Sequence, residues 1–176
     1  MWFICLLLAT VLGPAAWAQP TRAPAAPPAP LAPPIECGAF TGPASSEICA
    51  RANAGDAAAA AAIGRAFADG TGVTASQEEA SRLFRFAAER GNAEGLYRLA
   101  LQYQSGRGVP QDSHEATRLL IEAAALNHAA SRNALAMAYE DGLGVPQDLA
   151  RAAALYEQAA SQGSAEARFN LARMLQ

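Results

Sequence analysis

A seven-residue sequence that recurs at a constant interval constrains the fold of this chain more than any other feature. GLGVPQD (residues 142–148) nearly repeats GRGVPQD (residues 106–112), and a weaker copy starts at Gly70, so successive copies stand 36 positions apart. The same interval relates apolar residues elsewhere in the chain, at Ile63, Leu99, Leu135 and Leu171. A fixed period of this length is typical of stacked helical hairpins. A single hairpin cannot bury its apolar face, so such units fold as an array.

Within each period the residues predict two helices joined by the glycine-rich corner. In the third copy the first helix is expected from about Ala129 to Glu140, where apolar residues follow helical spacing. Gly106 and Gly142 are expected to end the first helices with a positive φ, which glycine adopts readily. The corner does not fit a phosphate or calcium loop, because its flanks are helical, the chain has no lysine and the loop carries one carboxylate. It is therefore interpreted as a structural turn.

The second helix of each repeat is expected to begin at a residue that caps its free amide groups. These N-cap residues are Ser76, Asp112 and Asp148. Glu79 and Glu115 follow the first two caps by three positions and predict a capping box, in which the glutamate accepts a hydrogen bond from the amide of the cap. The same helices are expected to end at residues that tolerate the left-handed conformation, namely Gly91, Asn127 and Gly163.

The period divides most of the chain into units with defined boundaries. Three full repeats are predicted over residues 56–91, 92–127 and 128–163, with a half-unit over residues 45–54 and a half-repeat over residues 164–176 as end caps. Apolar residues at helical spacing predict the buried stripe of the middle second helix, formed by Ala116, Leu119, Leu120, Ala123 and Ala124. The predicted fold class is all-α, a solenoid of about three antiparallel helix pairs with capping half-repeats, over residues 45–176.

The first 44 residues lack the repeat and predict an export signal followed by a spacer. Residues 2–12 are apolar but too few to span a bilayer, and Ala16 and Ala18 offer the small residues that a signal peptidase reads. We expect a signal peptide over residues 1–18, although no Lys or Arg precedes the apolar run, and no stable membrane insertion after its removal. Residues 19–44 are rich in proline and alanine and predict an extended, flexible spacer.

Two cysteines, Cys37 and Cys49, would lie in the exported part of the chain. An oxidising compartment favours the pairing of two nearby cysteines. Closing this loop would stabilise the fold by about 3 kcal/mol in the chain-entropy model. A metal site is the alternative, but zinc takes four ligands, and only His114 and His128 remain as candidates, far away in the sequence. A Cys37–Cys49 disulfide is therefore predicted, and no metal or other cofactor.

Charge and side-chain chemistry exclude several classes of function. The formal net charge is −3, and the cations, all arginines, form no basic cluster. This balance argues against nucleic acid or an anionic membrane as a partner. No serine, cysteine or histidine constellation suggests a nucleophile; His114 is expected to be solvated and His128 to start a helix. The chain is therefore predicted not to be an enzyme.

The repeat resembles the Sel-one-like repeat (SLR) family, a relative of tetratricopeptide repeats. The third copy carries the family pattern at Leu135-Ala136, Tyr139, residues 142–148, Ala152, Tyr156, Ala159-Ala160 and Gly163. The second copy matches as well, and the first is degenerate, with Ser76 in place of the aspartate. The resemblance covers about residues 45–176. It implies a right-handed superhelix of antiparallel helix pairs that takes part in protein–protein assembly, and an exported location such as a bacterial periplasm.

The resemblance further implies a scaffold or adaptor, regulatory in some relatives, that binds another protein or peptide in a concave groove. In related arrays this groove is lined by first-helix residues beside the packing positions. Carried onto this sequence, the candidate partner-binding residues are Arg65, Tyr97, Gln104, Asn133, Met137, Glu140 and Arg173. A second candidate surface, for a partner or a second copy, is the apolar side of the last helix, formed by Phe169, Leu171, Met174 and Leu175.

A cysteine-rich exported branch of the family suggests a different class of function. That branch carries a disulfide in each repeat and has been linked to β-lactam binding or hydrolysis. The likeness implies, as an alternative, a small exported hydrolase or a binder of cell-wall ligands. The repeats of this chain contain no cysteine, so β-lactam activity is not transferred to it. Turnover of nitrocefin and binding of muropeptides are the assays that distinguish the alternative.

The corner generates a first test of the predicted helix ends. Replacing Gly142 with valine should lower the free energy of unfolding by about 1–2 kcal/mol or more, because a β-branched residue is strained at a positive φ. Thermal or urea unfolding of the two proteins measures the difference. An unchanged melting curve would mean that the first helix does not end at this glycine.

Overall fold

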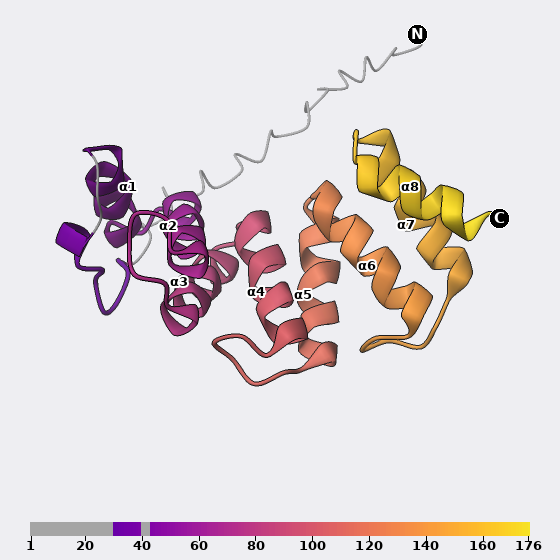
Figure 1. Ribbon diagram of the computed structural model, residues 1–176, viewed down its shortest axis with the longest axis horizontal. Helices are drawn as coiled ribbons and strands as arrows, with labels where there is room; N and C mark the ends of the chain where they lie inside the picture. The colour runs from indigo at the N-terminus through magenta and orange to yellow at the C-terminus, as the bar shows by residue number, and fades with distance from the viewer. Residues whose placement is uncertain (1–29, 40–42) are drawn as a thin grey trace, which may run out of the picture.

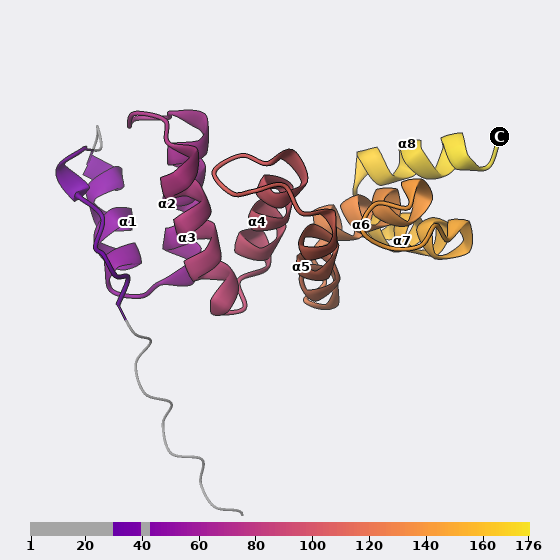
Figure 2. The same cartoon turned by 90° about the horizontal axis from the view of Figure 1, so that it is seen from below.

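The computed structural model describes residues 30–39 and 43–176, and all regular structure within these ranges is helical. The elements follow one another as η1 Cys37–Ala39, α1 Pro43–Asn53, α2 Ala57–Asp69, α3 Gln77–Glu89, α4 Ala93–Ser105, α5 Ser113–Ala125, α6 Ala129–Asp141, α7 Leu149–Ser161 and α8 Ala165–Met174. Consecutive helices contact each other, so the helices form an elongated stack that runs from α1 to α8 (Figure 1 and Figure 2). The predicted all-α solenoid is confirmed.

Three helical hairpins, α2 with α3, α4 with α5 and α6 with α7, make up the body of the stack. The apolar residues that recur in the first helices are buried, with Ile63, Leu99 and Leu135 each 3–4% exposed. The stripe predicted for the middle second helix is buried along its whole length, at Ala116, Leu119, Leu120, Ala123 and Ala124. Single helices, α1 and α8, pack against the two ends of the hairpins.

The corner between the two helices of a repeat has the predicted conformation. Gly106 and Gly142 follow the last residues of α4 and α6 with φ values of 68° and 73°. The Asp112 carboxylate then accepts a hydrogen bond from the amide of Glu115 at the start of α5, and Asp148 caps α7 in the same way. The second helices also end as predicted, with a positive φ at Gly91, Asn127 and Gly163.

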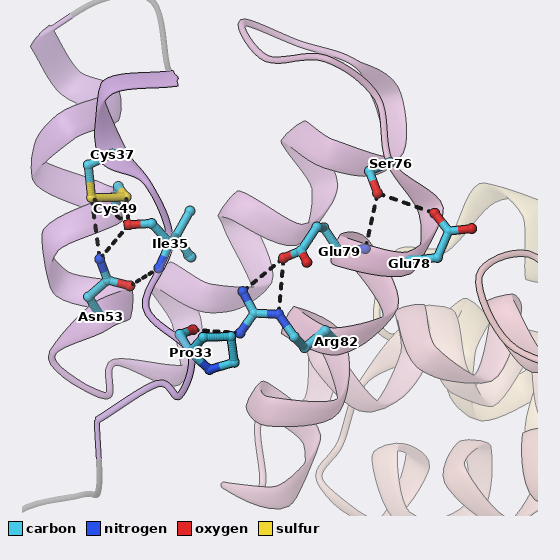
Figure 3. Close-up of polar contacts among 9 residues, drawn as sticks. All are labelled: Pro33, Ile35, Cys37, Cys49, Asn53, Ser76, Glu78, Glu79 and Arg82. Atoms are coloured by element: carbon cyan, nitrogen blue, oxygen red, sulfur yellow. Dashed lines mark hydrogen bonds and ion pairs between the residues drawn. A yellow bond between two sulfur atoms is a disulfide. The ribbon is translucent and has the colours of Figure 1, made fainter.

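Of the two hydrogen bonds predicted for each capping box, the one from the amide of the cap to the glutamate is wrong. Ser76 accepts a hydrogen bond from the Glu79 amide as expected, but its own amide donates to the Phe67 carbonyl at 3.0 Å. The Glu79 carboxylate is therefore not needed at the cap, and it binds the Arg82 guanidinium instead (Figure 3). The second repeat is built in the same way by Asp112, Tyr103, Glu115 and Arg118.

The corners of the second and third repeats also pack on the second helix of the preceding repeat. The buried Ser81 hydroxyl of α3 donates to the Arg107 carbonyl at 3.3 Å, and the buried Thr117 hydroxyl of α5 donates to the Leu143 carbonyl at 2.8 Å. These hydrogen bonds satisfy polar groups that would otherwise be buried without a partner. The corner therefore joins neighbouring repeats in addition to joining two helices.

The second glycine of the corner allows this contact because it has no side chain. A Cβ atom built on Gly108 would lie 2.1 Å from the Gln77 carbonyl oxygen, and one on Gly144 would lie 2.0 Å from the Ser113 carbonyl oxygen. Both distances are far below van der Waals contact. The His114 ring, expected to be solvated, is exposed but also places Nδ1 2.9 Å from the Gly144 carbonyl oxygen.

The segment before α1 is packed, which corrects the predicted end of the spacer. Leu31 and Ile35 are buried, and the Ile35 backbone exchanges two hydrogen bonds with the Asn53 side chain (Figure 3). The predicted disulfide is present, with the sulfur atoms of Cys37 and Cys49 2.09 Å apart. A flexible spacer up to residue 44 is therefore wrong for residues 30–39, because their apolar side chains and the disulfide fix them to the helices.

The predicted signal peptide (residues 1–18) and the first part of the spacer (residues 19–29) lie outside the described residues.

Arg82 of α3 donates to the Pro33 carbonyl at 2.8 Å, so the packed segment also contacts the first full repeat (Figure 3). No helix in the described ranges combines the length and the apolar character needed to cross a membrane.

Alanine substitutions at the two glycines of one corner distinguish the cost of backbone strain from the cost of disturbing the contact between repeats. Gly142 and Gly144 have φ values of 73° and 71°, so alanine at either position is strained, by about 1–2 kcal/mol. Only the Cβ of Gly144→Ala would clash with the preceding repeat, which should add about 1–3 kcal/mol. Urea unfolding of the two variants measures this difference. Equal losses of stability would show that the corner does not seat closely on α5.

Candidate functional site

A cavity of about 360 Å³ lies between the first helices of the second and third repeats, and we call it the α4/α6 groove. The large apolar residues of its lining are Tyr97 and Leu101 of α4, Met137 of α6 and Leu143 of the following corner. The side chains of Met137 and Leu143 are 45% and 48% exposed. Large apolar side chains that converge on one open cavity are a common feature of binding sites.

Polar groups surround the apolar part of the α4/α6 groove. Gln104 and Asn133 contribute amides, and Asp141 and Glu166 contribute carboxylates. No arginine is among the lining residues that the structure describes. The groove therefore combines an apolar lining with a negative rim.

The structure brings four of the seven predicted partner-binding residues together in this groove: Tyr97, Gln104, Asn133 and Met137. A fifth, Arg65, lines a different cavity. The remaining two, Glu140 and Arg173, do not line either cavity and form an ion pair at 2.8 Å. That all seven residues contact a partner stays a prediction.

Glu140 and Arg173 belong to a network that attaches α8 to the third repeat. The fully buried Tyr156 donates its hydroxyl to the Glu140 carboxylate at 2.7 Å, and Arg173 of α8 binds the same carboxylate. Burial, together with the adjacent carboxylate, raises the pKa of Tyr156 far above its usual value. These contacts account for Glu140 and Arg173 without a ligand.

Asn133 has a similar attachment at the edge of the α4/α6 groove. It is 6% exposed, its side-chain oxygen accepts a hydrogen bond from Asn170 at 3.1 Å, and its amide nitrogen lies 3.5 Å from the Glu166 carboxylate. Both partners lie on α8. Asn133 therefore orients Glu166 toward the rim of the groove.

Sequence reasoning missed the residues that the corner and α8 contribute. Leu143 and Gln111 come from corners, and Glu166 comes from the last helix. The corner was interpreted as a structural turn, which directed attention to the first helices alone. The signal that could have found Leu143 is the one difference between GRGVPQD and GLGVPQD, where Arg107 is replaced by Leu143.

A second cavity, of about 140 Å³, lies one repeat earlier, and we call it the α2/α4 groove. Its lining includes Arg65 of α2, Arg98 of α4 and Arg107 of the corner, together with Asp69. Leu101 lines this cavity as well as the α4/α6 groove. The two grooves are therefore neighbours on the face formed by the first helices.

Comparison with known protein families identifies the repeat. The family model described as Sel1 repeat matches residues 57–92, 93–128 and 129–164, which together make up more than half of the chain. The chain belongs to the Sel1 repeat family. Each matched segment starts one residue after the predicted boundary, and proteins built from Sel1 repeats are generally scaffolds for protein–protein interaction.

Solved structures with Sel1 repeats share the fold. The Sel1 repeat protein from Oxalobacter formigenes is 29% identical, with a TM-score of 0.62 over 66% of this chain and 48% of its own. The protein c5321, described as a protective antigen present in uropathogenic Escherichia coli strains and displaying an SLR fold, is 30% identical, with a TM-score of 0.67 over 75% of this chain and 29% of its own. This chain thus corresponds to half or less of both proteins.

A more distant structure extends the likeness of fold. Helicobacter pylori cysteine rich protein B is 21% identical, with a TM-score of 0.56 over 65% of this chain and 89% of its own. Among curated proteins, none matches the chain.

The second and third Sel1 repeats also bring three polar side chains into a row. His128 places Nε2 3.4 Å from the Glu94 carboxylate and Nδ1 2.8 Å from the Ser131 hydroxyl. This order resembles a hydrolytic triad, but Ser131 is fully buried, so a substrate cannot reach its hydroxyl. The His128 ring also packs against Tyr97, with ring centroids 5.3 Å apart, and thereby supports the α4/α6 groove.

Side chains that could bind a metal ion do not cluster in the described part of the chain. Among the described residues, no group of three or more His, Cys, Asp or Glu side chains is placed to hold a metal ion. Cys37 and Cys49 are joined to each other, and the histidines interact with Gly144, Glu94 and Ser131.

The Glu94 carboxylate predicts a dependence of stability on pH. A hydrogen bond from His128, with Arg98 also contributing, lowers the pKa of Glu94 from 4.5 to about 2 although partial burial opposes this shift. A depressed pKa in the folded state stabilises the protein above the unfolded-state pKa, and this contribution is lost as pH falls from about 4.5 toward 2. Glu94→Gln should therefore destabilise by about 1 kcal/mol at pH 6, since the carboxylate is 32% exposed and partly screened.

Urea unfolding of the wild type and Glu94→Gln between pH 2 and 7 measures this effect. The difference in stability should shrink as the pH falls through the acid range. Glu157→Gln, which removes an exposed carboxylate of α7, should show no such pH dependence. A constant difference between wild type and Glu94→Gln would contradict the lowered pKa.

Proposed function

We propose that this chain is an exported Sel1 repeat adaptor that binds a segment of another protein in the α4/α6 groove and has no catalytic activity of its own. The observation that supports the proposal most is the convergence of Tyr97, Leu101, Met137 and Leu143 on one open cavity of about 360 Å³. Half-exposed apolar side chains gain free energy when a partner covers them.

The polar groups of the groove suit a peptide segment. Gln104 lies at the rim, and its side-chain amide makes no hydrogen bond within the described part of the chain. A side-chain amide offers both a donor and an acceptor, which matches the alternating polar groups of a peptide backbone. An apolar lining with a few such groups fixes both the position and the orientation of a ligand.

The disulfide supports an exported location. Disulfides persist in oxidising compartments and are rare in the cytosol, and Cys37–Cys49 fixes the packed segment before α1. The apolar run and the small residues at Ala16 and Ala18 agree with this location at the level of sequence. The proposed compartment is the periplasm or the exterior of a bacterial cell.

A hydrolase or cell-wall-ligand binder is the weaker proposal. Ser131, whose hydroxyl lies beside His128 in line with Glu94, is 0% exposed. The three repeats carry no cysteine, unlike the cysteine-rich branch of the family. Nitrocefin turnover or saturable muropeptide binding by the purified chain would revive this proposal.

Capture of the partner tests the groove. The tagged chain should recover a stoichiometric protein partner from its native compartment, and Met137→Ala with Leu143→Ala should reduce that recovery at least tenfold. Both side chains are half-exposed, so their truncation removes partner contacts with little effect on folding. Quantitative mass spectrometry of the captured material measures the loss.

A matched control uses two apolar side chains of similar exposure outside the groove. Leu126→Ala with Leu149→Ala removes residues that are 51% and 53% exposed and should leave the recovery unchanged. Equal recovery with both double variants, or no stoichiometric partner with the wild type, would refute binding in the α4/α6 groove.

A further inference from the structure

The α2/α4 and α4/α6 grooves are the same site one repeat apart, yet their chemistry is opposite. Positions 36 residues apart line the two cavities, so residues can be compared pair by pair. At three positions an arginine of the first groove is replaced by an aliphatic residue in the second: Arg65 by Leu101, Arg98 by Ala134 and Arg107 by Leu143. A fourth position changes from Ser105 to Asp141.

The first groove has positive charge that the described residues do not neutralise. Arg98 forms an ion pair with Glu94 at 2.7 Å, but the side chains of Arg65 and Arg107 have no carboxylate within ion-pair distance in the described part of the chain. Asp69 is the one acidic residue among the lining residues described. An anionic group of a ligand is therefore favoured between Arg65 and Arg107.

The second groove has the opposite character. Asp141 and Glu166 line it without an ion pair in the described ranges, and the residues between them are apolar or neutral. A carboxylate of a ligand would be repelled there, whereas an apolar side chain would fill the space between Met137 and Leu143. Charge thus reverses along one continuous face.

The two grooves are close enough for one short segment to occupy both. Leu101 lines both cavities, and α2 contacts α4 directly. Packed helices lie about 10 Å apart, and an extended peptide advances about 3.3 Å per residue. The two contact points of a ligand that spans from one groove to the next therefore lie about three positions apart in its sequence.

We infer that the two grooves form one site for a bipartite protein segment, with an acidic side chain against Arg65 and Arg107 and an apolar side chain about three residues away, between Met137 and Leu143. The inference rests on the proposed function of the α4/α6 groove and adds the chemistry of the partner. A reversed segment would place its carboxylate near Asp141 and Glu166, so the site selects one orientation by repulsion as well as attraction.

The charge pattern distinguishes this partner from a nucleic acid. A nucleic acid carries phosphates at regular intervals and needs cations along its whole path. The α4/α6 groove offers carboxylates and no arginine among its described lining residues. A segment with one acidic end and one apolar end satisfies both grooves.

The near-identical corners supply the variants for a test. Arg107 and Leu143 occupy the same position in sequences that are otherwise equal, so Arg107→Leu and Leu143→Arg each place a residue in a backbone that already holds it one repeat away. Random 12-residue peptides are selected on the purified full chain, and the dissociation constants of the enriched peptides are measured by fluorescence polarisation.

The expected result has three parts. Enriched peptides carry Asp or Glu three or four positions from Leu, Met or Phe, and their affinity falls as salt is added. Arg107→Leu and Leu143→Arg each weaken binding about tenfold or more, and so does replacement of the peptide's acidic residue by lysine. Arg85→Gln, which removes an exposed arginine of α3 outside both grooves, leaves binding unchanged.

Two other outcomes separate the inference from the function on which it rests. If Met137→Ala with Leu143→Ala abolishes binding while Arg107→Leu and Arg65→Gln leave it unchanged, the bipartite site is refuted and the α4/α6 groove stands. If no selected peptide responds to variants in either groove, both are refuted. Circular dichroism melting of each variant confirms that the comparison is made on folded protein.

Discussion

The stack depends on the contact of the second and third glycine corners with the second helix of the repeat before each of them. The Thr117 hydroxyl donates to the Leu143 carbonyl, and Gly144 approaches the Ser113 carbonyl so closely that no Cβ fits between them. Hydrogen bonding and close approach together fix the distance between neighbouring repeats. The contact between a corner and the second helix of the preceding repeat therefore also fixes the width of the grooves between the first helices.

Most of the fold could be predicted from the sequence because its determinants lie within one period. A positive φ at Gly142, a capping carboxylate at Asp148 and a buried stripe that includes Leu119 each depend on residues a few positions apart. The prediction of the capping box was wrong because the competing hydrogen bond comes from a residue outside the helix. The Ser76 amide finds the Phe67 carbonyl only when the corner has closed, and pattern reasoning on one helix cannot anticipate that competitor.

The candidate site was only partly predictable, because it is assembled from several elements. Tyr97 and Met137 were found since they lie on first helices, beside the packing positions. Glu166 was missed because it enters from α8, 33 residues beyond Asn133, and only the contact between these two side chains places it at the groove. Arg173 does not line this groove, because it pairs with Glu140 outside it, and its contact with a partner stays a prediction.

One residue of the corner connects the fold to the chemistry of the grooves. The carbonyls of Arg107 and Leu143 accept the hydrogen bonds from Ser81 and Thr117, while their side chains line the α2/α4 and α4/α6 grooves. Every amino acid has a backbone carbonyl, so stacking places no demand on the side chain at this position. The residue between the two glycines can therefore change from arginine to leucine without altering the array, and each repeat can present its own chemistry to a partner.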